Sequence, residues 1–438
     1  MLRILDVSGE RLDDYSSVLP RASFDVDHAI SVVEPICRAV AEEGEPALRR
    51  FAQQFDHVVP EHLRIPARAL DDALAAIDPQ LRAAIEESIR RRREVCERVE
   101  REEPARSVEL APGASVGQRL VPVSRVGLYV PGGLAPLAST VLMNVVPAQV
   151  AGVSSIALAT PPQAEFGGLP NPTILAVARL LDVDEVYAVG GAQAVAMFAY
   201  GVAGLCRRAD MVTGPGNIYV VAAKRLLRGR IGIDAEAGPT EIAVLADASA
   251  DPAKVGADLI SQAEHDPLAG AVLVTDSRAL IDAVQVQLAR QIERLDTRQR
   301  LVTSLSGAQS GAILVADIDQ GVDVVNDYAA EHLEIQTANA RELVARIRNA
   351  GAIFVGSHSP VPLGDYSAGS THVLPTGGAA HFSSGLTVRS FLKAVHVIDY
   401  SPSALAQIGP AVQAFAHAEK LPGHANAIAA RTQPQEQE

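Results

Sequence analysis

The stretch EIAVLADASADPAKVGADLISQAEHDPLAGAVLVT, residues 241–275, holds a complete strand–helix–strand pattern. Residues 242–246 and 271–275 are short apolar runs that predict buried strands. Between them, Asp251-Pro252 is typical of a helix start, and apolar residues at helical spacing continue to about His265. The stretch therefore predicts a right-handed βαβ crossover in a parallel sheet.

The end of this helix carries two side chains that could bind a metal. Pro267 disfavours helical geometry at Asp266, so Gln262 and His265 fall in the last turn, three residues apart and on one face. An amide oxygen and an imidazole at this spacing can hold two corners of a zinc site. Such a pair is also an ordinary polar helix end, and the spacing alone leaves both interpretations open.

The same alternation of apolar runs and helical patterns extends in both directions. It predicts an α/β fold with two successive doubly wound units, each a parallel sheet covered by helices on both faces. The expected strands are residues 126–130, 155–160, 185–189 and 209–213, then 242–246, 271–275, 312–315, 332–335 and 352–355. The expected helices are residues 139–150, 172–181, 193–200 and 218–227, then 252–265, 277–295, 321–329 and 338–349.

The flanking regions have other patterns. Residues 1–105 are mostly helical, residues 356–385 have the composition of a loop, and a helical pattern returns at residue 401. The expected division is an extension over 1–25, a helical segment over 26–118 that packs on the second unit, the first unit over 119–236, the second unit over 237–385, and a C-terminal appendage over 386–438.

Composition excludes several classes of function. The 438 residues include 52 acidic and 38 basic side chains, a net charge of −14 that argues against a nucleic-acid partner. The one basic run, residues 90–93, is flanked by glutamates and predicts a solvated helix face. Cys37, Cys96 and Cys206 have no CxxC spacing, which predicts buried apolar residues rather than disulfides or zinc ligands. Without a signal-like or bilayer-length apolar segment, we expect a cytoplasmic protein with no membrane partner.

Three glycine turns follow predicted strands of the first unit, at residues 131–133, 190–191 and 214–216. In open parallel sheets such turns let a backbone approach a ligand, and helix N-termini there attract anions. None of the three is a GxGxxG motif. They fit either a nucleotide site or ordinary tight turns.

Seven motifs follow one another over nearly the whole chain. They are VGLYVPGG (126–133), VGGAQA (189–194), GPGN (214–217), AGPTE (237–241), SQAEH (261–265), EHLE (331–334), and GDY (364–366) continuing to HVLPTG (372–377). In this order the chain resembles the histidinol dehydrogenase family. The resemblance implies incomplete Rossmann-like units in an intertwined homodimer with shared active sites.

The resemblance also implies the site residues. It places one Zn²⁺ per subunit on Gln262, His265, Asp365 and His424, the last from the partner subunit. It makes Glu331 and His332 the acid–base pair, and it places NAD on Tyr129, Gln193 and Asn217. Substrate contacts fall to Thr240, Gln262, His265, His332, Asp365, His372, Glu419 and His424. Thr240 stands where serine is common in the family, which keeps the hydroxyl.

The implied reaction takes L-histidinol through L-histidinaldehyde to L-histidine with two NAD⁺, as the last steps of histidine biosynthesis. We assign the removal of the hydroxyl proton to His332 and the activation of water for aldehyde hydration to Glu331. Zinc would orient the imidazole and amine of the substrate. Because adjacent strand residues point to opposite faces, both side chains can reach one site only at a bend or a strand end.

Three alternatives remain. A paralogue could oxidise another small alcohol, such as a sulfonated diol, but it would leave His372 and Glu419 without their roles. A zinc hydrolase would have no use for the three NAD positions. A non-catalytic metal-binding protein would not need the pair Glu331-His332.

Overall fold

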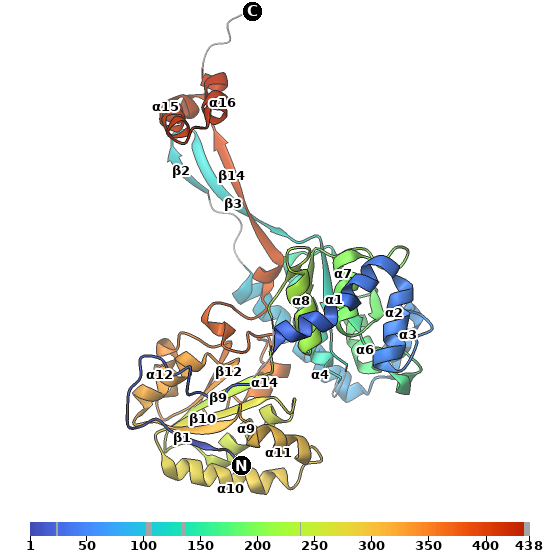
Figure 1. Cartoon of the computed structure of the whole chain (residues 1–438), viewed down its shortest axis with the longest axis vertical. Coiled ribbons are helices and arrows are strands. Elements are labelled where there is room, and N and C mark those ends of the chain that lie inside the picture. The colour runs from blue at the N-terminus through green and yellow to red at the C-terminus, as the bar shows by residue number, and fades with distance from the viewer. Residues whose placement is uncertain (23–24, 102–106, 133–135, 237, 433–438) are drawn as a thin grey trace, which may run out of the picture. The chain divides into compact units, whose positions relative to one another are not determined.

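The computed structural model describes residues 1–22, 25–101, 107–132, 136–236 and 238–432 (Figure 1). Gly133 and Ala237, which belong to two of the motifs above, lie outside the described residues, as does the tail from residue 433. The chain divides into unit 1, residues 1–100 and 124–390, and unit 2, residues 101–123 and 391–438. Both sheets of unit 1 are parallel, which confirms the predicted mixed α/β fold.

The first sheet of unit 1 has five strands in the order β6-β5-β4-β7-β8. They are β4 (Arg125–Tyr129), β5 (Ser155–Thr160), β6 (Val186–Ala188), β7 (Met211–Thr213) and β8 (Gly232–Ile233). The helices are α5 (Ala138–Ala151), α6 (Pro172–Leu180), α7 (Gly191–Tyr200) and α8 (Ile218–Leu227). All four predicted strands and all four predicted helices of this region are confirmed within a few residues. The sequence pattern missed β8, which is too short to show alternation.

The second sheet has six strands in the order β1-β11-β10-β9-β12-β13. They are β1 (Ile4–Asp6), β9 (Glu241–Ala246), β10 (Gly270–Thr275), β11 (Gly311–Leu314), β12 (His332–Gln336) and β13 (Ala352–Val355). The helices are α9 (Pro252–Ala263), α10 (Arg278–Ile292), α11 (Arg298–Ser306), α12 (Ile318–Tyr328), α13 (Ala340–Leu343) and α14 (Val361–Tyr366). Ile242 and Val244 pack in an apolar cluster with α9, while Ala243 and Leu245 pack in another with α12. Because helices pack on both faces of the sheet, every residue of β9 and β10 is buried, which explains their uninterrupted apolar runs.

Several expected elements differ from the structure. β1 and α11 were not predicted, and the helix expected over 338–349 is only α13 followed by a 3₁₀ turn, Val344–Arg346. The expected loop 356–385 contains α14. Its glycine and serine residues hide this short helix, which begins at a proline in its first turn and ends after six residues.

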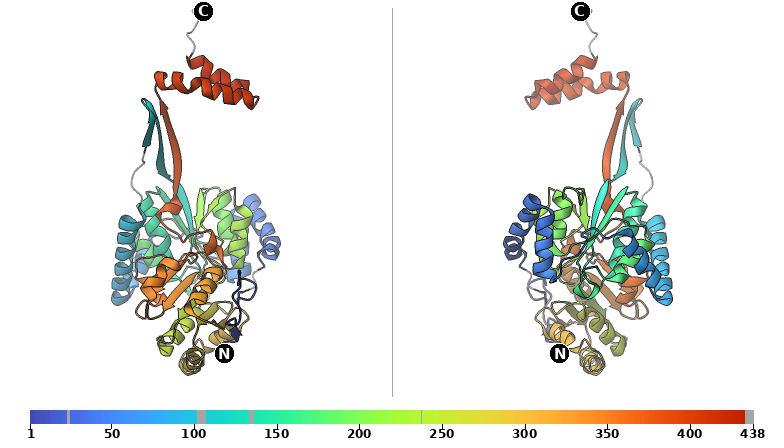
Figure 2. Two further views of the ribbon diagram at one scale, coloured as in Figure 1. Left: turned by 90° about the vertical axis from the view of Figure 1, so that its left-hand side faces the viewer. Right: turned by 90° about the vertical axis from the view of Figure 1, so that its right-hand side faces the viewer.

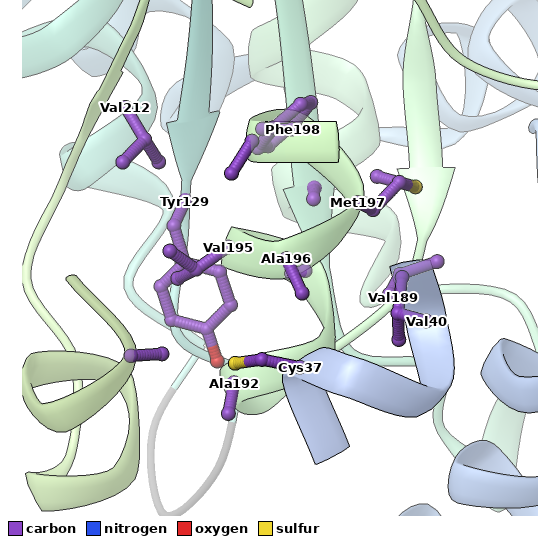
Figure 3. Close-up of a cluster of buried hydrophobic side chains, with 14 of the residues drawn as sticks. Cys37, Val40, Tyr129, Val189, Ala192, Val195, Ala196, Met197, Phe198 and Val212 are labelled. Atoms are coloured by element: carbon purple, nitrogen blue, oxygen red, sulfur yellow. The ribbon is translucent and has the colours of Figure 1, made fainter. Parts of the chain in front are cut away.

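The N-terminal helices are α1 (Val26–Glu43), α2 (Glu45–Phe51), α3 (Ala67–Ala76) and α4 (Pro79–Val95). We expected this segment on the second unit. Helices α1, α3 and α4 pack on helices of the first sheet, α1 on α7 and α8, α3 on α6 and α4 on α5, while α4 also contacts Ser367 and Gly369 of the expected second unit. Figure 3 shows Cys37 of α1 beside Ala192 and Tyr129, and Val40 of α1 beside Val189, all in one apolar cluster. An amphipathic stripe identifies the buried face of a helix but not the surface that covers it.

The predicted burial of all three cysteines is confirmed. The expectation for the basic run of α4 is correct for Arg90 and Arg91, which are half exposed and paired with Glu87. It is wrong for Arg92, which is 0% exposed. Arg92 continues the inward stripe of Ile85 and Ser88, so helical periodicity turns one member of the run into the core.

Unit 2 consists of a three-stranded antiparallel sheet and two helices (Figures 1 and 2). The strands are β2 (Ser107–Ala111), β3 (Ala114–Pro122) and β14 (Leu392–Tyr400), in the order β14-β3-β2, and the helices α15 (Pro402–Ala418) and α16 (Pro422–Thr432) pack on each other. The predicted C-terminal helices are confirmed, whereas the strands were missed. β3 and β14 pair over nine residues that are far apart in sequence. In the described part of the chain, no helix is both long and apolar enough to span a bilayer.

Candidate active site

The amino ends of β9 and β12, which are neighbours in the six-stranded sheet, bring three predicted residues together. Thr240 directly precedes β9, Glu331 directly precedes β12, and His332 is the first residue of β12. The Thr240 hydroxyl donates to Glu331 Oε2 at 2.5 Å, and the Glu241 backbone N–H donates to the same oxygen at 3.1 Å. His332 Nδ1 lies 3.6 Å from that oxygen. Glu331 and His332 therefore meet at a strand end, as their shared site requires.

The last turn of α9 reaches the same edge. Helix α9 follows β9 and runs back along the sheet, so its C-terminal end returns to the amino ends of the strands. Gln262 is 0% exposed, and its Nε2 donates to Thr240 Oγ1 at 2.5 Å. Its Oε1 is buried and accepts no hydrogen bond within the described chain. One continuous chain of hydrogen bonds thus joins Gln262, Thr240 and Glu331.

His265 and Asp365 complete the part of the predicted metal site that lies in unit 1. His265 Nε2 and Asp365 Oδ2 are 3.9 Å apart, too far for a direct hydrogen bond. Asp365 lies in α14, the short helix within the expected loop. Among the described residues, no group of three or more His, Cys, Asp and Glu side chains could hold a metal. The predicted set in unit 1 supplies one histidine, one aspartate and the amide of Gln262.

His372 contacts both this loop and helix α5 of the first sheet. One ring nitrogen, Nδ1, lies 3.1 Å from the backbone oxygen of Asp365, and Nε2 lies 3.1 Å from the hydroxyl of Thr140 in α5. Sequence reasoning missed Thr140. The only signal was its place in the first turn of the helix that follows the VGLYVPGG motif.

Burial dominates the electrostatics of Glu331. It raises the pKa of this carboxyl well above its usual value, and the hydrogen bonds from Thr240 and the Glu241 backbone act against that rise. The negative charges of Glu241 and Asp365 raise the pKa further. Once deprotonated, Glu331 is a stronger base than an exposed glutamate.

Burial acts in the opposite direction on His332 and lowers its pKa to about 4. Neither ring nitrogen has a hydrogen-bond partner among the described residues. The imidazole is therefore neutral at physiological pH and offers a free acceptor. This differs from the expected titration near neutral pH, because the sequence does not reveal how completely the ring is buried.

The first sheet collects its predicted residues at the opposite end of its strands. The connections after β4 and β7 leave the sheet at the point where the strand order reverses, which is a usual ligand position in parallel sheets. Gly214 has φ +112°, and a Cβ there would lie 2.0 Å from the backbone oxygen of Tyr129. Only glycine permits this approach. The Tyr129 hydroxyl accepts the Gly191 backbone N–H at 3.1 Å.

Gln193 and Asn217 stand at the starts of two helices near this edge. Gln193 is buried in the first turn of α7. Asn217 is the N-cap of α8, and its side-chain oxygen accepts the backbone N–H groups of Tyr219 and Val220 at 3.1 and 3.2 Å. Two helix N-termini at one edge suit the binding of an anionic group.

The two remaining predicted residues, Glu419 and His424, lie in unit 2 where α15 meets α16. Both are exposed. With Phe415 and Leu421 they line a shallow hollow of about 400 Å³.

Comparison with known proteins identifies the family of this arrangement. Residues 19–432 match the family model described as Histidinol dehydrogenase. The chain belongs to the histidinol dehydrogenase family. It is therefore an oxidoreductase, as the motifs predicted.

Curated members of the histidinol dehydrogenase family are closely similar to this chain. The histidinol dehydrogenase of Cutibacterium acnes is 65% identical over 98% of this chain and 99% of its own length. That of Thermobifida fusca is 59% identical over 99% and 98%. The crystal structure of histidinol dehydrogenase from Elizabethkingia anophelis superposes with a TM-score of 0.90 at 30% identity and covers 98% of both chains.

Proposed function

We propose that this protein oxidises L-histidinol through L-histidinaldehyde to L-histidine and reduces two NAD⁺, as the last steps of histidine biosynthesis. The observation that carries the proposal is the chain of hydrogen bonds from Gln262 through Thr240 to Glu331, with His332 beside it. It supports the assignment of an acid–base pair beside candidate metal ligands in a member of this family.

The residues present fit the zinc ion that the family implies. Gln262 Oε1 is a buried acceptor without a donor, and His265 and Asp365 face each other across 3.9 Å without a hydrogen bond. Oxygen and nitrogen donors of this kind suit Zn²⁺. Gln262, His265 and Asp365 would hold the ion together with His424 of the partner subunit. When bound, zinc would orient the imidazole and amine of the substrate.

In the first oxidation, a hydride leaves the carbinol carbon for the nicotinamide ring, and the hydroxyl proton moves to His332. The neutral imidazole can accept that proton because neither of its nitrogens has another partner. The aldehyde then takes up water. Glu331 accepts a proton from the water as the water oxygen bonds to the carbonyl carbon, and it returns that proton to the former carbonyl oxygen, which gives the gem-diol. A second hydride then leaves the diol carbon for a second NAD⁺. His332, which has released the first proton to solvent, accepts a hydroxyl proton of the diol, and the product is a carboxylic acid.

The cofactor side of the proposal is the first sheet. Residues 119–236 form an incomplete Rossmann-like unit whose Tyr129, Gln193 and Asn217 contact NAD at the carboxyl edge. Residues 237–385 form a second such unit with the substrate, metal and acid–base residues. Two helix N-termini and close backbone approach at Gly214 support this division.

The third part of the proposal is an intertwined homodimer in the cytoplasm. Glu419 and His424 of the partner subunit would complete each active site, so that residues 386–438 serve the neighbouring copy. Exposed apolar side chains on unit 2 support an interface, for example Ile398 at 71% and Phe415 at 70% exposure.

The test is the stoichiometry of NADH formed from limiting L-histidinol and excess NAD⁺, before and after chelation and return of zinc. We expect two NADH per histidinol, lost on chelation and restored by zinc. One NADH would mean that the aldehyde is not carried forward. No NADH would reject the proposal in favour of a paralogue that oxidises another small alcohol.

A further inference from the structure

Arg92 is unusual among the arginines of α4 because its side chain is completely buried. It is 0% exposed, whereas the side chain of Arg90, two residues earlier, is 58% exposed and pairs with Glu87 and Glu94 on the surface. A buried guanidinium requires a carboxylate and further acceptors to balance its lost hydration.

The partners of Arg92 come from three separate places in unit 1. Its guanidinium binds both carboxylate oxygens of Glu100, at 2.5 and 3.2 Å. It also donates to the backbone oxygen of Gly369 at 3.1 Å and to that of Leu386 at 3.4 Å. Glu100 Oε2 in turn accepts the backbone N–H of Val388 at 3.0 Å.

These contacts join the loop of the candidate active site to α4. Gly369 lies between Asp365 and His372, which are a proposed metal ligand and a proposed substrate contact. The loop approaches α4 so closely that a Cβ on Gly369 would lie 2.9 Å from the backbone oxygen of Arg91. The backbone N–H of Leu386 donates to the backbone oxygen of Val373 at 2.8 Å, which joins the two ends of this part of the loop.

The same contacts hold the two ends of unit 1 from which the chain continues into unit 2. Glu100 is the last residue of unit 1 before residues 101–123, and Val388 lies two residues before the end of its second segment at Ser390. The Arg92–Glu100 ion pair therefore makes hydrogen bonds to Gly369 and Leu386 of the loop and to Val388 near the end of the second segment.

We propose that Arg92, held by Glu100, is a positioning residue that fixes residues 365–388 on α4 and so sets the places of Asp365 and His372. This inference rests on the proposed function for its kinetic consequences. It predicts that loss of the ion pair loosens the substrate and metal side of the site and leaves the NAD side unchanged.

The direct test is hydrogen–deuterium exchange of the full-length protein without added metal or substrate, for the wild type and Arg92→Met. Methionine has a similar length but no charge and no donor. We expect peptides within 365–388 to exchange about tenfold faster or more, while peptides of β9 and β10 are unchanged. Arg90→Met is the matched control on the same helix and should exchange like the wild type.

A kinetic measurement separates positioning from general destabilisation. In Arg92→Met, we expect the KM for L-histidinol and the dissociation constant of added Zn²⁺ to rise about tenfold, with the KM for NAD⁺ within about twofold of the wild type. Equal changes for both substrates, faster exchange throughout the chain, or no change in any quantity would overturn the proposal.

Two further results keep the outcome decisive. If Arg92→Met does not fold, Glu100→Gln is measured instead, because it keeps the arginine and one acceptor oxygen. It should show faster exchange within residues 365–388, with a smaller increase than in Arg92→Met. Unchanged exchange within 365–388 in Glu100→Gln overturns the proposal. If the wild type does not oxidise L-histidinol, the proposed function fails. The exchange and zinc measurements then still decide the role of Arg92.

Discussion

The two parallel sheets of unit 1 have similar architecture but place their candidate binding residues at opposite strand ends. In the first sheet, Tyr129 and Asn217 lie at the carboxyl edge, where glycines let backbones meet. In the second sheet, Thr240 and Glu331 lie at the amino edge, where the crossover helix α9 returns with Gln262. In a parallel sheet, backbone N–H groups therefore line the carboxyl ends of the strands, and the C-terminal ends of the crossover helices reach the amino ends of the strands.

The difference matches the ligands we propose for each edge. Backbone amides and helix N-termini suit the pyrophosphate of a dinucleotide. Buried side chains such as Gln262 and His332, with acceptors left free, suit a metal and a small polar substrate. Variants that alter the residues at one end of the strands, measured for the binding of both ligands, test this difference.

The largest effect is expected at the metal side of the second sheet. Replacing His265 or Asp365 with Ala removes one of few ligands, so zinc retention and turnover should be lost together, with activity reduced at least about 1,000-fold. Bound zinc is measured by atomic emission after dialysis, beside the rate of NADH formation. His358→Ala, which removes an exposed imidazole, is the control. A His265→Ala variant that remains active after chelation would refute the ligand assignment.

The next effect separates the two neighbouring residues at the start of β12. His332→Asn should slow the oxidation of L-histidinol by about 100- to 10,000-fold, because it removes the proposed base. Glu331→Gln should slow mainly the oxidation of L-histidinaldehyde, because it removes the base for hydration. Each variant is assayed on both substrates. Equal losses on both substrates in both variants would contradict the division of roles.

A smaller effect is expected at the carboxyl edge of the first sheet. Gly214→Ala places a Cβ 2.0 Å from the Tyr129 backbone oxygen, so this edge must shift. We expect a loss of about 1–3 kcal/mol in the free energy of unfolding and a higher KM for NAD⁺. Gly204→Ala is the control, because Gly204 also has a positive φ, +75°, but no atom lies within 4 Å of the added carbon. Identical behaviour of the two variants would show that the close approach has no importance for NAD.

Much of this arrangement could be predicted from the sequence. Every strand longer than three residues in the two parallel sheets was expected, because both faces of each sheet are buried and the runs are apolar. The start of α9 at Asp251-Pro252 was also correct. The family motifs named Glu331 and His332, and the structure brings them together with Thr240.

Other features depend on contacts that no local pattern encodes. β1 has three residues and forms only against β11, which lies about 300 positions later. The burial of Arg92 depends on Glu100 and on backbone oxygens of a distant loop. The low pKa of His332 results from the burial of its ring, which leaves the residue only 4% exposed. The periodicity of a sequence shows which face of a helix or strand is buried, but it does not show which residues cover that face.

The smallest effect concerns a buried pair beneath the amino edge, Glu334 of β12 and Asp258 of α9. Burial, and then the charge of Asp258, raises the pKa of Glu334 to about 9 from 4.5. The folded protein therefore keeps a proton that the unfolded chain releases, and stability falls as pH rises through the range from about 4.5 to about 9. Glu334→Gln cannot lose this proton. Urea unfolding at pH 6 and pH 8.5 should show that the free energy of unfolding falls less between these two pH values in Glu334→Gln than in the wild type. The same fall in both proteins would contradict the raised pKa of Glu334.

The most direct test of the division between the sheets is calorimetric titration of NAD⁺ and of L-histidinol with zinc into Asn217→Ser and His265→Ala. Serine keeps an N-cap oxygen for α8 but removes the amide N–H groups. We predict that Asn217→Ser weakens only NAD⁺ binding and that His265→Ala weakens only histidinol binding. A variant that weakens the binding of both ligands equally, or of the opposite ligand, would contradict the account.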